Sequence, residues 1–292
     1  MPHDQQNKTL LKGKRLAPHR QLGQNFLIHQ ATAEKIVRLA GVTPDDVILE
    51  LGVGFGALTQ PLAAIARQVI GLELDSGIIT WHSEQQDLPP NVTLRHQDLL
   101  KADFGAISDE SGGRLKIIAN LPYSVSNPLL FKLIENQEIM EWAVLMLQKE
   151  VADRLIARAG TKEYGILSIL LATCATVEPL MKVGPGQFHP RPKVDSAVVR
   201  IRFNPRPARA AELPTHDAGL LRLIVRGSFQ QRRKNLLNSL SNTIALGLTK
   251  EQTGLVLAAA AIPTATRPEQ LHLEDFVRLT NCYTTFRNDC ST

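Results

Sequence analysis

The stretch VILELGVGFGALT, residues 47–59, decides the fold class of this chain. Its first five residues predict a buried strand, and the residues after the glycines begin a helix. Glycines let the backbone turn tightly and let a ligand approach it, while the start of the helix offers N–H groups. We therefore expect an α/β fold that binds a ligand at this loop. The pattern Gly-x-Gly-x-x-Ala is also present, so a dinucleotide site is the obvious alternative.

Acidic residues follow the next expected strands. The run 68–75 predicts a strand that contains Glu73, about 20 residues beyond the glycines, which is the place of a ribose-binding carboxylate. Asp98 follows another short apolar segment and could accept a hydrogen bond from an adenine amine. A single acid at a strand end is usually a solvated loop residue. Here the glycine loop, Glu73 and Asp98 occur in the order of a nucleoside site, which favours a cofactor with ribose and adenine.

The tetrapeptide Asn120-Leu121-Pro122-Tyr123 follows the apolar run 115–119, so it lies where an open α/β sheet presents its chemistry. The Asn120 side chain and the backbone carbonyl before Pro122 supply two acceptors, and Tyr123 supplies an aromatic face, which together suit a planar amine. The exocyclic nitrogen of adenine is a poor nucleophile because its lone pair is delocalised. Hydrogen bonds to both its hydrogens stabilise the positive charge that grows as it attacks. A strand-ending turn without chemistry is the simpler alternative for the tetrapeptide alone.

These motifs resemble those of the class I S-adenosylmethionine-dependent methyltransferases. Within that group the chain is most similar to the small-subunit (16S-type) rRNA adenine N6,N6-dimethyltransferases, the kasugamycin-sensitivity enzymes. The resemblance covers almost the whole chain and includes GQNFL at 23–27, FHPRPKVDS at 188–196 and RRKNLLNSL at 232–240. The last two segments are long and specific. The family usually has Pro where this chain has Val53, but that position contributes backbone rather than side chain.

The resemblance implies a role for each site residue. In the target-base site, Asn120 and the Leu121 carbonyl before Pro122 would hold the amine, and Tyr123 and Phe188 would stack or edge-pack the flipped base. The residues implied to bind S-adenosylmethionine are Asn25, Leu27, Gly52, Gly54, Glu73, Asp98 and Asn120.

The implied reaction is methyl transfer from S-adenosylmethionine to N6 of two adjacent adenosines in a hairpin near the 3′ end of small-subunit rRNA. The product would be N6,N6-dimethyladenosine, formed within an assembling ribosomal particle. We expect a direct in-line displacement without a covalent intermediate, because the sulfonium already makes the methyl electrophilic and the protein chiefly supplies positioning. A monomer is expected from the resemblance.

Length and composition predict more than one domain, since the chain has 292 residues of which 43% are hydrophobic. We expect a flexible basic arm over 1–20, an S-adenosylmethionine-binding catalytic domain over 21–203 and a helical rRNA-binding domain over 204–292. The alternation of strands and helices predicts a mainly parallel sheet with helices on both faces, whose late strands come from the apolar runs at 142–147 and 197–203. The resemblance implies that this sheet is Rossmann-like and has seven strands.

Several classes of protein are disfavoured by the sequence. Inspection finds no apolar stretch of the roughly 18 residues that span a bilayer and no apolar signal core, so we expect a cytoplasmic protein without membrane contact. The three cysteines and the histidines lack metal-ligand spacing, and no metal site is expected.

The net charge of +5 is concentrated in two places, the first twenty residues and the segment 221–240. A charge run is usually an ordinary solvated helix face. An enzyme that acts on structured RNA needs phosphate contacts, however, so here the target-base motif favours an RNA-binding surface. The residues expected to contact RNA are Arg222, Arg226, Arg232, Arg233 and Lys234.

Three alternatives remain open at this point. A related enzyme could methylate one adenine of large-subunit rRNA and confer macrolide resistance. A non-catalytic assembly or transcription factor could keep the fold and bind RNA, but the presence of Asn120, Tyr123, Glu73 and Asp98 argues against lost chemistry. An NAD-linked dehydrogenase would explain the glycine loop, but it leaves the tetrapeptide 120–123 and the basic segment unexplained.

Overall fold

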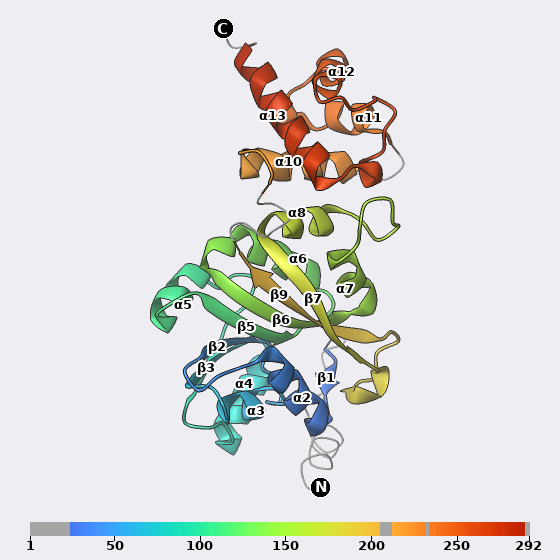
Figure 1. Ribbon diagram of the computed structural model, residues 1–292. Coiled ribbons are helices and arrows are strands. Elements are labelled where there is room, and N and C mark those ends of the chain that lie inside the picture. Colours follow the sequence, from blue (N-terminus) through green and yellow to red (C-terminus); the bar gives the residue numbers. More distant parts are fainter. Residues whose placement is uncertain (1–23, 205–211, 232–233, 290–292) are drawn as a thin grey trace. The chain divides into compact units, whose positions relative to one another are not determined.

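The computed structural model describes residues 24–204, 212–231 and 234–289 (Figure 1). The expected arm at 1–20, together with Arg232 and Arg233, lies outside the described residues. Contacts divide the chain into two compact units. The first contains the described residues up to Ala152 together with Thr176–Asn204, and the second contains Asp153–Ala175 and the described residues after 211. The segment Asp153–Ala175 therefore groups with the C-terminal helices, although it lies inside the range expected for the catalytic domain.

The first unit alternates strands and helices. Its strands are β1 (Phe26–Leu27), β2 (Val47–Leu51), β3 (Gln68–Glu73), β4 (Val92–His96), β5 (Leu115–Asn120), β6 (Met140–Gln148), β7 (Ala175–Val183), β8 (Phe188–His189) and β9 (Ser196–Phe203). Its helices are α2 (Gln30–Ala40), α3 (Thr59–Ala63), α4 (Ser76–Gln85), α5 (Phe104–Ser111) and α6 (Ser126–Glu135), with 3-10 turns η2 (Gln137–Ile139) and η3 (Pro185–Gln187). Helix α7 (Lys149–Leu155) spans the division between the units.

Seven strands form one sheet in the order β4-β3-β2-β5-β6-β9-β7, and β1 pairs with β8 in a separate two-stranded sheet. Strands β4, β3, β2, β5 and β6 are parallel, while β9 runs antiparallel to β6. Helices α2, α3 and α4 lie on one face and α5 and α6 on the other (Figure 1). The expected seven-stranded, mainly parallel sheet with helices on both faces is confirmed, as are the late strands predicted from the runs 142–147 and 197–203.

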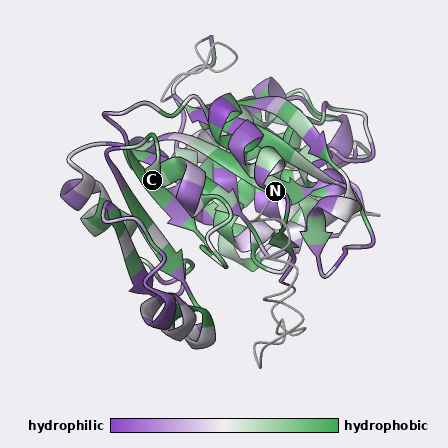
Figure 2. Cartoon of the chain, turned by 90° about the horizontal axis from the view of Figure 1, so that it is seen from below, coloured by the Kyte–Doolittle hydropathy of each residue, from purple (hydrophilic) through white to green (hydrophobic). Residues whose placement is uncertain are grey.

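The central strands are buried because both faces of the sheet are covered. In β2, Ile48, Leu49 and Leu51 are almost fully buried, as are Ile117 and Ile118 in β5. Such near-continuous apolar runs are typical of parallel strands between two helical layers. In Figure 2 hydrophobic residues accordingly gather on the strands, and hydrophilic residues lie on the outer helices and loops.

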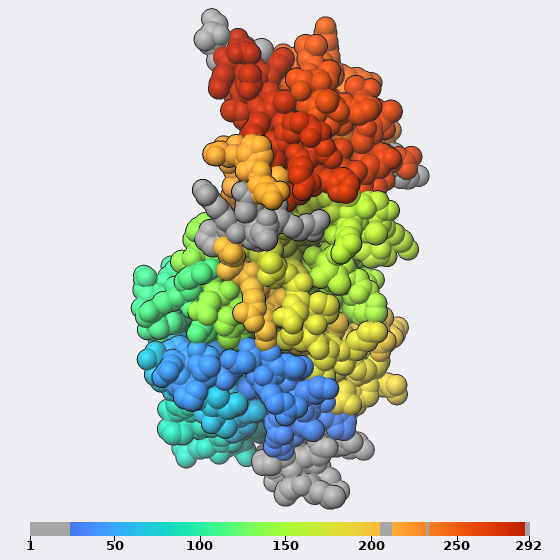
Figure 3. Space-filling view, viewed as in Figure 1, coloured from blue at the N-terminus to red at the C-terminus, as the bar shows by residue number. Residues whose placement is uncertain are grey.

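Strand β7 is an edge strand and differs from the central strands. It contains the polar residue Glu178 and the proline Pro179, and several of its residues are exposed (yellow in Figure 3). Proline and exposed polar residues are tolerated at an edge because one side of the strand has no hydrogen-bonding neighbour. This strand contains no apolar run from which it could be predicted.

The order of the strands in the parallel sheet determines where the site lies. The chain proceeds from β2 outward through β3 to β4, and then returns to the other side of β2 as β5. The carboxyl ends of β2 and β5 therefore meet at a point where the connections diverge, which is the usual ligand position in open α/β sheets. Residues of the glycine loop and Asn120 leave the sheet at this point.

The second unit is helical. It consists of α8 (Ile166–Cys174), α10 (Ala218–Phe229), α11 (Leu236–Ser241), α12 (Lys250–Ala259) and α13 (Leu273–Asp289), with short 3-10 turns at Ile244–Leu246 and Pro268–Gln270. Its buried side chains include Leu221, Val225 and Phe276. The loop before α8 is fixed to the unit, because the Tyr164 hydroxyl donates to the Leu271 carbonyl at 2.9 Å.

Candidate active site

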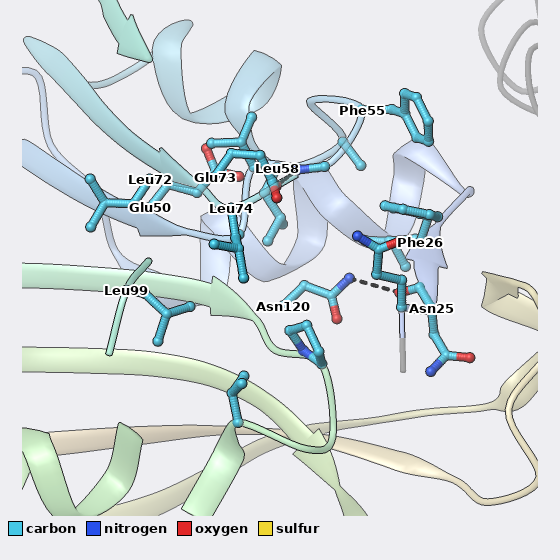
Figure 4. A pocket seen from close by; sticks show the side chains of 18 of the residues that line it. Asn25, Phe26, Glu50, Phe55, Leu58, Leu72, Glu73, Leu74, Leu99 and Asn120 are labelled. Atoms are coloured by element: carbon cyan, nitrogen blue, oxygen red, sulfur yellow. Dashed lines mark hydrogen bonds between the residues drawn. The ribbon is translucent and has the colours of Figure 1, made fainter. Parts of the chain in front are cut away.

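A pocket opens at the carboxyl ends of β2, β3, β4 and β5 (Figure 4). It encloses about 1120 Å³ of empty space, including its open mouth, which is enough for a nucleoside-sized ligand. Sequence motifs from five separate segments meet there. Of the residues expected to bind the cofactor, the pocket is lined by Asn25, Leu27, Gly52, Gly54, Glu73, Asp98 and Asn120.

The glycine loop forms the floor of the pocket with its backbone. Gly52 and Gly54 have φ angles of 80° and 54°, in the left-handed region that favours glycine. The Gly52 amide donates to the Leu72 carbonyl at 2.9 Å, which fixes the start of the loop to β3. A Cβ atom on Gly54 would lie 3.1 Å from Cδ1 of Phe26. Any side chain at Gly54 would therefore strain the loop and crowd a ring that lines the pocket.

Val53, the departure from the usual family pattern, packs against Gly71 of β3. A Cβ atom at Gly71 would lie only 2.5 Å from Cγ2 of Val53, so this pair needs a glycine on the neighbouring strand. We predict that Gly71→Ala destabilises the protein by about 1–3 kcal/mol, because overpacking forces the glycine loop to move. Thermal unfolding measures this loss. The double variant Val53→Ala/Gly71→Ala should recover most of it; additive losses in the double variant would contradict the proposed clash.

Glu73 fixes the loop and faces the pocket at the same time. Its side chain is only 7% exposed. Oε2 accepts a hydrogen bond from the Gly54 amide at 2.9 Å, and Oε1 accepts one from the Asp75 amide at 2.9 Å. Each carboxylate oxygen can accept a further bond, so both stay able to receive ligand hydroxyls.

Asp98 lies in the turn after β4 and is held by the backbone that follows it. Its Oδ1 accepts a hydrogen bond from the Leu100 amide at 2.8 Å. Lys132 of α6 donates to the carbonyls of Leu100 and Ala102 at 2.8 and 2.5 Å. Burial lowers the pKa of Lys132, while the negative charges of Asp98 and Asp103 raise it. The position of Lys132 could not be predicted from the sequence, because a lysine in an amphipathic helix is usually a solvated surface residue.

Asn120 ends β5 and is oriented by the segment before α2. Its Nδ2 donates to the Asn25 carbonyl at 3.2 Å, shown as the dashed line in Figure 4. This bond uses a donor of the amide group and leaves Oδ1 as the acceptor end of the side chain. The arrangement is the one that an amine-binding role requires.

The remaining residues of the target-base motif lie outside the cofactor pocket, except for Pro122, which lines it. The Leu121 side chain is buried, and the half-buried Tyr123 places its hydroxyl 3.3 Å from Oγ of Ser196. Phe188 is 4% exposed and packs in the core with Leu27, its partner across the β1–β8 pair. The structure does not bring Tyr123 and Phe188 into the pocket, and their contact with a target base stays a prediction.

Glu50 is a site residue that the sequence reasoning missed. It lies within β2, lines the pocket and is 1% exposed, and neither carboxyl oxygen has a hydrogen-bond partner among the described residues. Burial raises the pKa of Glu50 to about 8; the nearby Thr59 side chain lowers it in part, and the negative charge of Glu73 raises it further. An acid inside an otherwise apolar strand was the available signal, because unpaired acids are rarely fully buried.

The buried acid gives a pH-dependent prediction for stability. The folded-state pKa of Glu50 lies above the ordinary value of 4.5, so the folded protein binds more protons and loses stability as the pH rises from 4.5 towards 8. Glu50→Gln removes this penalty. We expect the variant to be more stable than wild type by up to about 3 kcal/mol at pH 7, with little difference near pH 4.5. Urea unfolding at several pH values measures the difference, and a pH-independent difference would contradict the assigned protonation.

The charge of the pocket separates two classes of ligand. Its ionisable lining residues are Glu50, Glu73 and Asp98, and no Lys, Arg or His lines it among the described residues. A dinucleotide carries a pyrophosphate that the carboxylates of Glu73 and Asp98 would repel, whereas a cationic nucleoside would be attracted. The pocket therefore disfavours the NAD alternative and fits S-adenosylmethionine.

The basic residues expected to bind RNA lie on and after α10. Arg222 is half-buried, while Arg226 and Lys234 are exposed. The basic segment 221–240 includes residues of two helices, α10 and α11.

Among the described residues, no group of three or more His, Cys, Asp or Glu side chains is placed to hold a metal ion. No helix in the described part of the chain combines the length and the apolar character needed to cross a bilayer.

Comparison with known proteins points to one family of enzymes. Residues 15–284 match the family model described as ribosomal RNA adenine dimethylase. A relative from Desulfotalea psychrophila, named ribosomal RNA small subunit methyltransferase A, is 51% identical over 283 residues, which cover 94% of this chain and 95% of the relative. A relative of the same name from Geobacter metallireducens is 40% identical over 270 residues, covering 92% of this chain and 96% of the relative.

A solved structure supports the same match. The dimethyladenosine transferase from Plasmodium falciparum superimposes with a TM-score of 0.71 at 25% sequence identity, covering 89% of this chain and 97% of that chain. The likeness includes both the α/β unit and the C-terminal helices.

Proposed function

This chain belongs to the ribosomal RNA adenine dimethylase family, whose members use S-adenosylmethionine as methyl donor, and we propose that it acts on the small subunit. Specifically, it transfers methyl groups to N6 of two adjacent adenosines in a hairpin near the 3′ end of small-subunit rRNA. The product is N6,N6-dimethyladenosine. The choice of the small subunit is supported by the 51% identical relative, which is named a small-subunit methyltransferase. The two adenosines and their hairpin rest on the family resemblance.

One observation supports the assignment most strongly: Asn120 and Pro122 of the target-base motif line the same acid-lined pocket as the cofactor-binding motifs. Gly54, Glu73 and Asp98 line it on one side of β2, and Asn120 lines it from β5 on the other. A cation-bearing nucleoside can lie on the glycine floor while the amine of a second nucleoside reaches Asn120.

The proposed cofactor contacts follow from donor and acceptor chemistry. Glu73 accepts from the ribose hydroxyls, and Asp98 accepts from the adenine amine. Asn25 and the Leu27 backbone hold the methionine end, and the backbone of Gly52 and Gly54 passes close to the ligand. Asn120 contacts the cofactor from the side of the pocket where the target amine also binds.

The proposed chemistry of the target is stabilisation of a developing charge. The bound cofactor supplies a methyl group that its sulfonium makes electrophilic. Oδ1 of Asn120 and the carbonyl of Leu121 accept the two N–H groups of the adenine amine, and they favour positive charge on its nitrogen. Pro122 restricts the backbone conformation of Leu121, whose carbonyl is the second acceptor. Tyr123 and Phe188 contact the flipped base.

The proposed RNA-binding residues are Arg222, Arg226, Arg232, Arg233 and Lys234, and the expected partner is rRNA in an assembling particle. Because the pocket is acidic, affinity for RNA must come from basic side chains elsewhere on the chain. The proposal treats the enzyme as a monomer in which the helical unit carries these contacts.

We predict that Arg222→Ala and Arg226→Ala each weaken binding to small-subunit particles without changing affinity for the cofactor. Each lost phosphate contact should reduce the slope of log affinity against log salt by about one. Particle binding at several salt concentrations measures the slopes, with Lys250→Ala, at the start of α12, as a charge-matched control. Slopes identical to wild type in both arginine variants would remove these residues from the RNA surface.

A methyl-transfer assay tests the proposed substrate. Purified protein and labelled S-adenosylmethionine are incubated with small- or large-subunit particles from cells that lack the modifications, and label in each rRNA is counted. Label in small-subunit rRNA alone is expected. Label confined to large-subunit rRNA would favour a resistance methylase, and binding of both cofactor and particles without transfer would favour a non-catalytic assembly factor.

A further inference from the structure

Glu50 is a buried carboxyl group that the proposed reaction does not use. It is 1% exposed in the middle of the sheet, and its Oε1 and Oε2 lack hydrogen-bond partners among the described residues. Its neighbours in register are Gly71 of β3 and Ile118 of β5, neither of which can donate from a side chain. Because Glu50 also lines the pocket, a bound ligand can supply the partner that its carboxyl oxygens lack.

The charged groups around Glu50 do not compensate a negative charge. Glu73 on β3 raises the pKa of Glu50, and Asp98 lines the same pocket from the turn after β4. The basic residue of β5, Lys116, is 2.6 Å from Asp46, just before the opposite end of β2. From α4, His82 contacts the Gly54 carbonyl and Asp87, each at 2.8 Å.

From α3, the Thr59 hydroxyl lies next to Glu50 and is itself fully buried. A hydroxyl cannot neutralise a carboxylate, and the negative charge of Glu73 opposes ionisation of Glu50. An ionised Glu50 in the empty pocket would therefore be a buried charge without a counter-charge, which is costly.

We propose that Glu50 is a neutral carboxylic acid in the empty protein and gives up its proton when the cofactor binds, so that its carboxylate becomes the counter-charge for the cationic end of the ligand. This inference rests on the proposed cofactor site. The proton passes to the buffer, no covalent bond to the ligand is formed, and the pocket gains an ion pair in place of an unpaired acid.

The coupling has a definite sign. Because the empty-state pKa of Glu50 is raised to about 8, nearly the whole population carries the proton at pH 7, and binding releases close to one proton per cofactor. Affinity for S-adenosylmethionine should therefore increase about tenfold per pH unit as the pH rises towards 8, and should level off above it.

Isothermal titration calorimetry tests the proposal without measuring turnover. S-adenosylmethionine is titrated into the full chain at pH 7 in phosphate and in Tris, whose ionisation enthalpies differ, so that the difference in heat gives the protons released. Wild type should release close to one proton. Glu50→Gln should release almost none, and Glu84→Gln, an exposed acid on α4, should behave as wild type.

The outcomes separate this inference from the proposed function. Binding by wild type without proton release, or undiminished release by Glu50→Gln, would overturn the inference and leave the cofactor site intact. Absence of any binding would overturn both. If Glu50→Gln does not fold, the affinity of wild type between pH 6 and 9 decides, since a pH-independent affinity contradicts the coupling.

S-adenosylhomocysteine identifies the cationic group, because it keeps the ammonium of the methionine end but lacks the sulfonium. Equal proton release with both ligands assigns the ammonium as the partner of Glu50. Release with S-adenosylmethionine alone assigns the sulfonium. Either result supports the proposed change of protonation.

Discussion

Asn120→Ala should lower the turnover number by about 10²- to 10³-fold while the dissociation constant of S-adenosylmethionine changes little. The side-chain oxygen of Asn120 is proposed to accept from the target amine, and that bond strengthens as positive charge develops on the nitrogen. Its loss therefore raises the barrier more than it weakens the ground state. Single-turnover methyl transfer at saturating cofactor and particles measures the rate, and calorimetry measures cofactor affinity.

A matched variant controls for the loss of an amide. Asn242→Ala removes an exposed asparagine in the helical unit and should leave turnover unchanged. Thermal unfolding measures whether Asn120→Ala folds; among the described residues, the substitution removes one side-chain hydrogen bond, to the Asn25 carbonyl. A folded variant that loses cofactor affinity and turnover to the same extent would show that Asn120 serves the cofactor rather than the target base.

Glu73→Ala should abolish measurable cofactor binding at ordinary concentrations and also destabilise the protein. Two backbone amides, those of Gly54 and Asp75, lose their carboxylate acceptor, and an unpaired buried donor costs about 1–3 kcal/mol. The ribose contact is lost at the same time. We expect affinity for S-adenosylmethionine to fall by about 10²-fold or more, since hydrogen bonds to a charged group contribute about 1.5–3 kcal/mol.

Glu73→Gln separates the two roles of this carboxylate. Glutamine has one acceptor oxygen, so it can keep one of the two amide bonds while its NH₂ group faces the other. Its stability should lie between those of wild type and Glu73→Ala, but its cofactor affinity should stay close to that of the alanine variant. Wild-type affinity in Glu73→Gln would contradict a direct contact between Glu73 and the cofactor.

The fold could be predicted from the sequence wherever burial on both faces leaves an apolar run. Strands β2, β3, β5, β6 and β9 are of this kind, and residues 47–59 also specify the turn between β2 and α3. Strand β7 could not be predicted in this way, because an edge strand needs no apolar run and tolerates a proline such as Pro179. The grouping of Asp153–Ala175 with the helical unit could not be predicted either, because it depends on long-range contacts such as that between Tyr164 and Leu271.

The site was predictable only in part. Gly54, Glu73, Asp98 and Asn120 occur in motifs whose spacing reflects the order of the strands, and the structure gathers all four at one pocket. Glu50 is a site residue because no hydrogen-bond donor lies beside its buried carboxyl group among the described residues. The presence or absence of a donor depends on the packing of other segments and cannot be predicted from the apolar run that contains Glu50. The roles proposed for these residues await the variants described above.

The central claim is that this chain makes N6,N6-dimethyladenosine in small-subunit rRNA. The most direct measurement is mass analysis of nucleosides digested from small-subunit particles that lack the modification, after incubation with the protein and S-adenosylmethionine. We expect dimethyladenosine at two adjacent positions in a 3′-terminal hairpin of the rRNA, and none when Asn120→Ala replaces the wild type. Monomethyladenosine as the final product, or no methylated adenosine from particles that the protein binds, would contradict it.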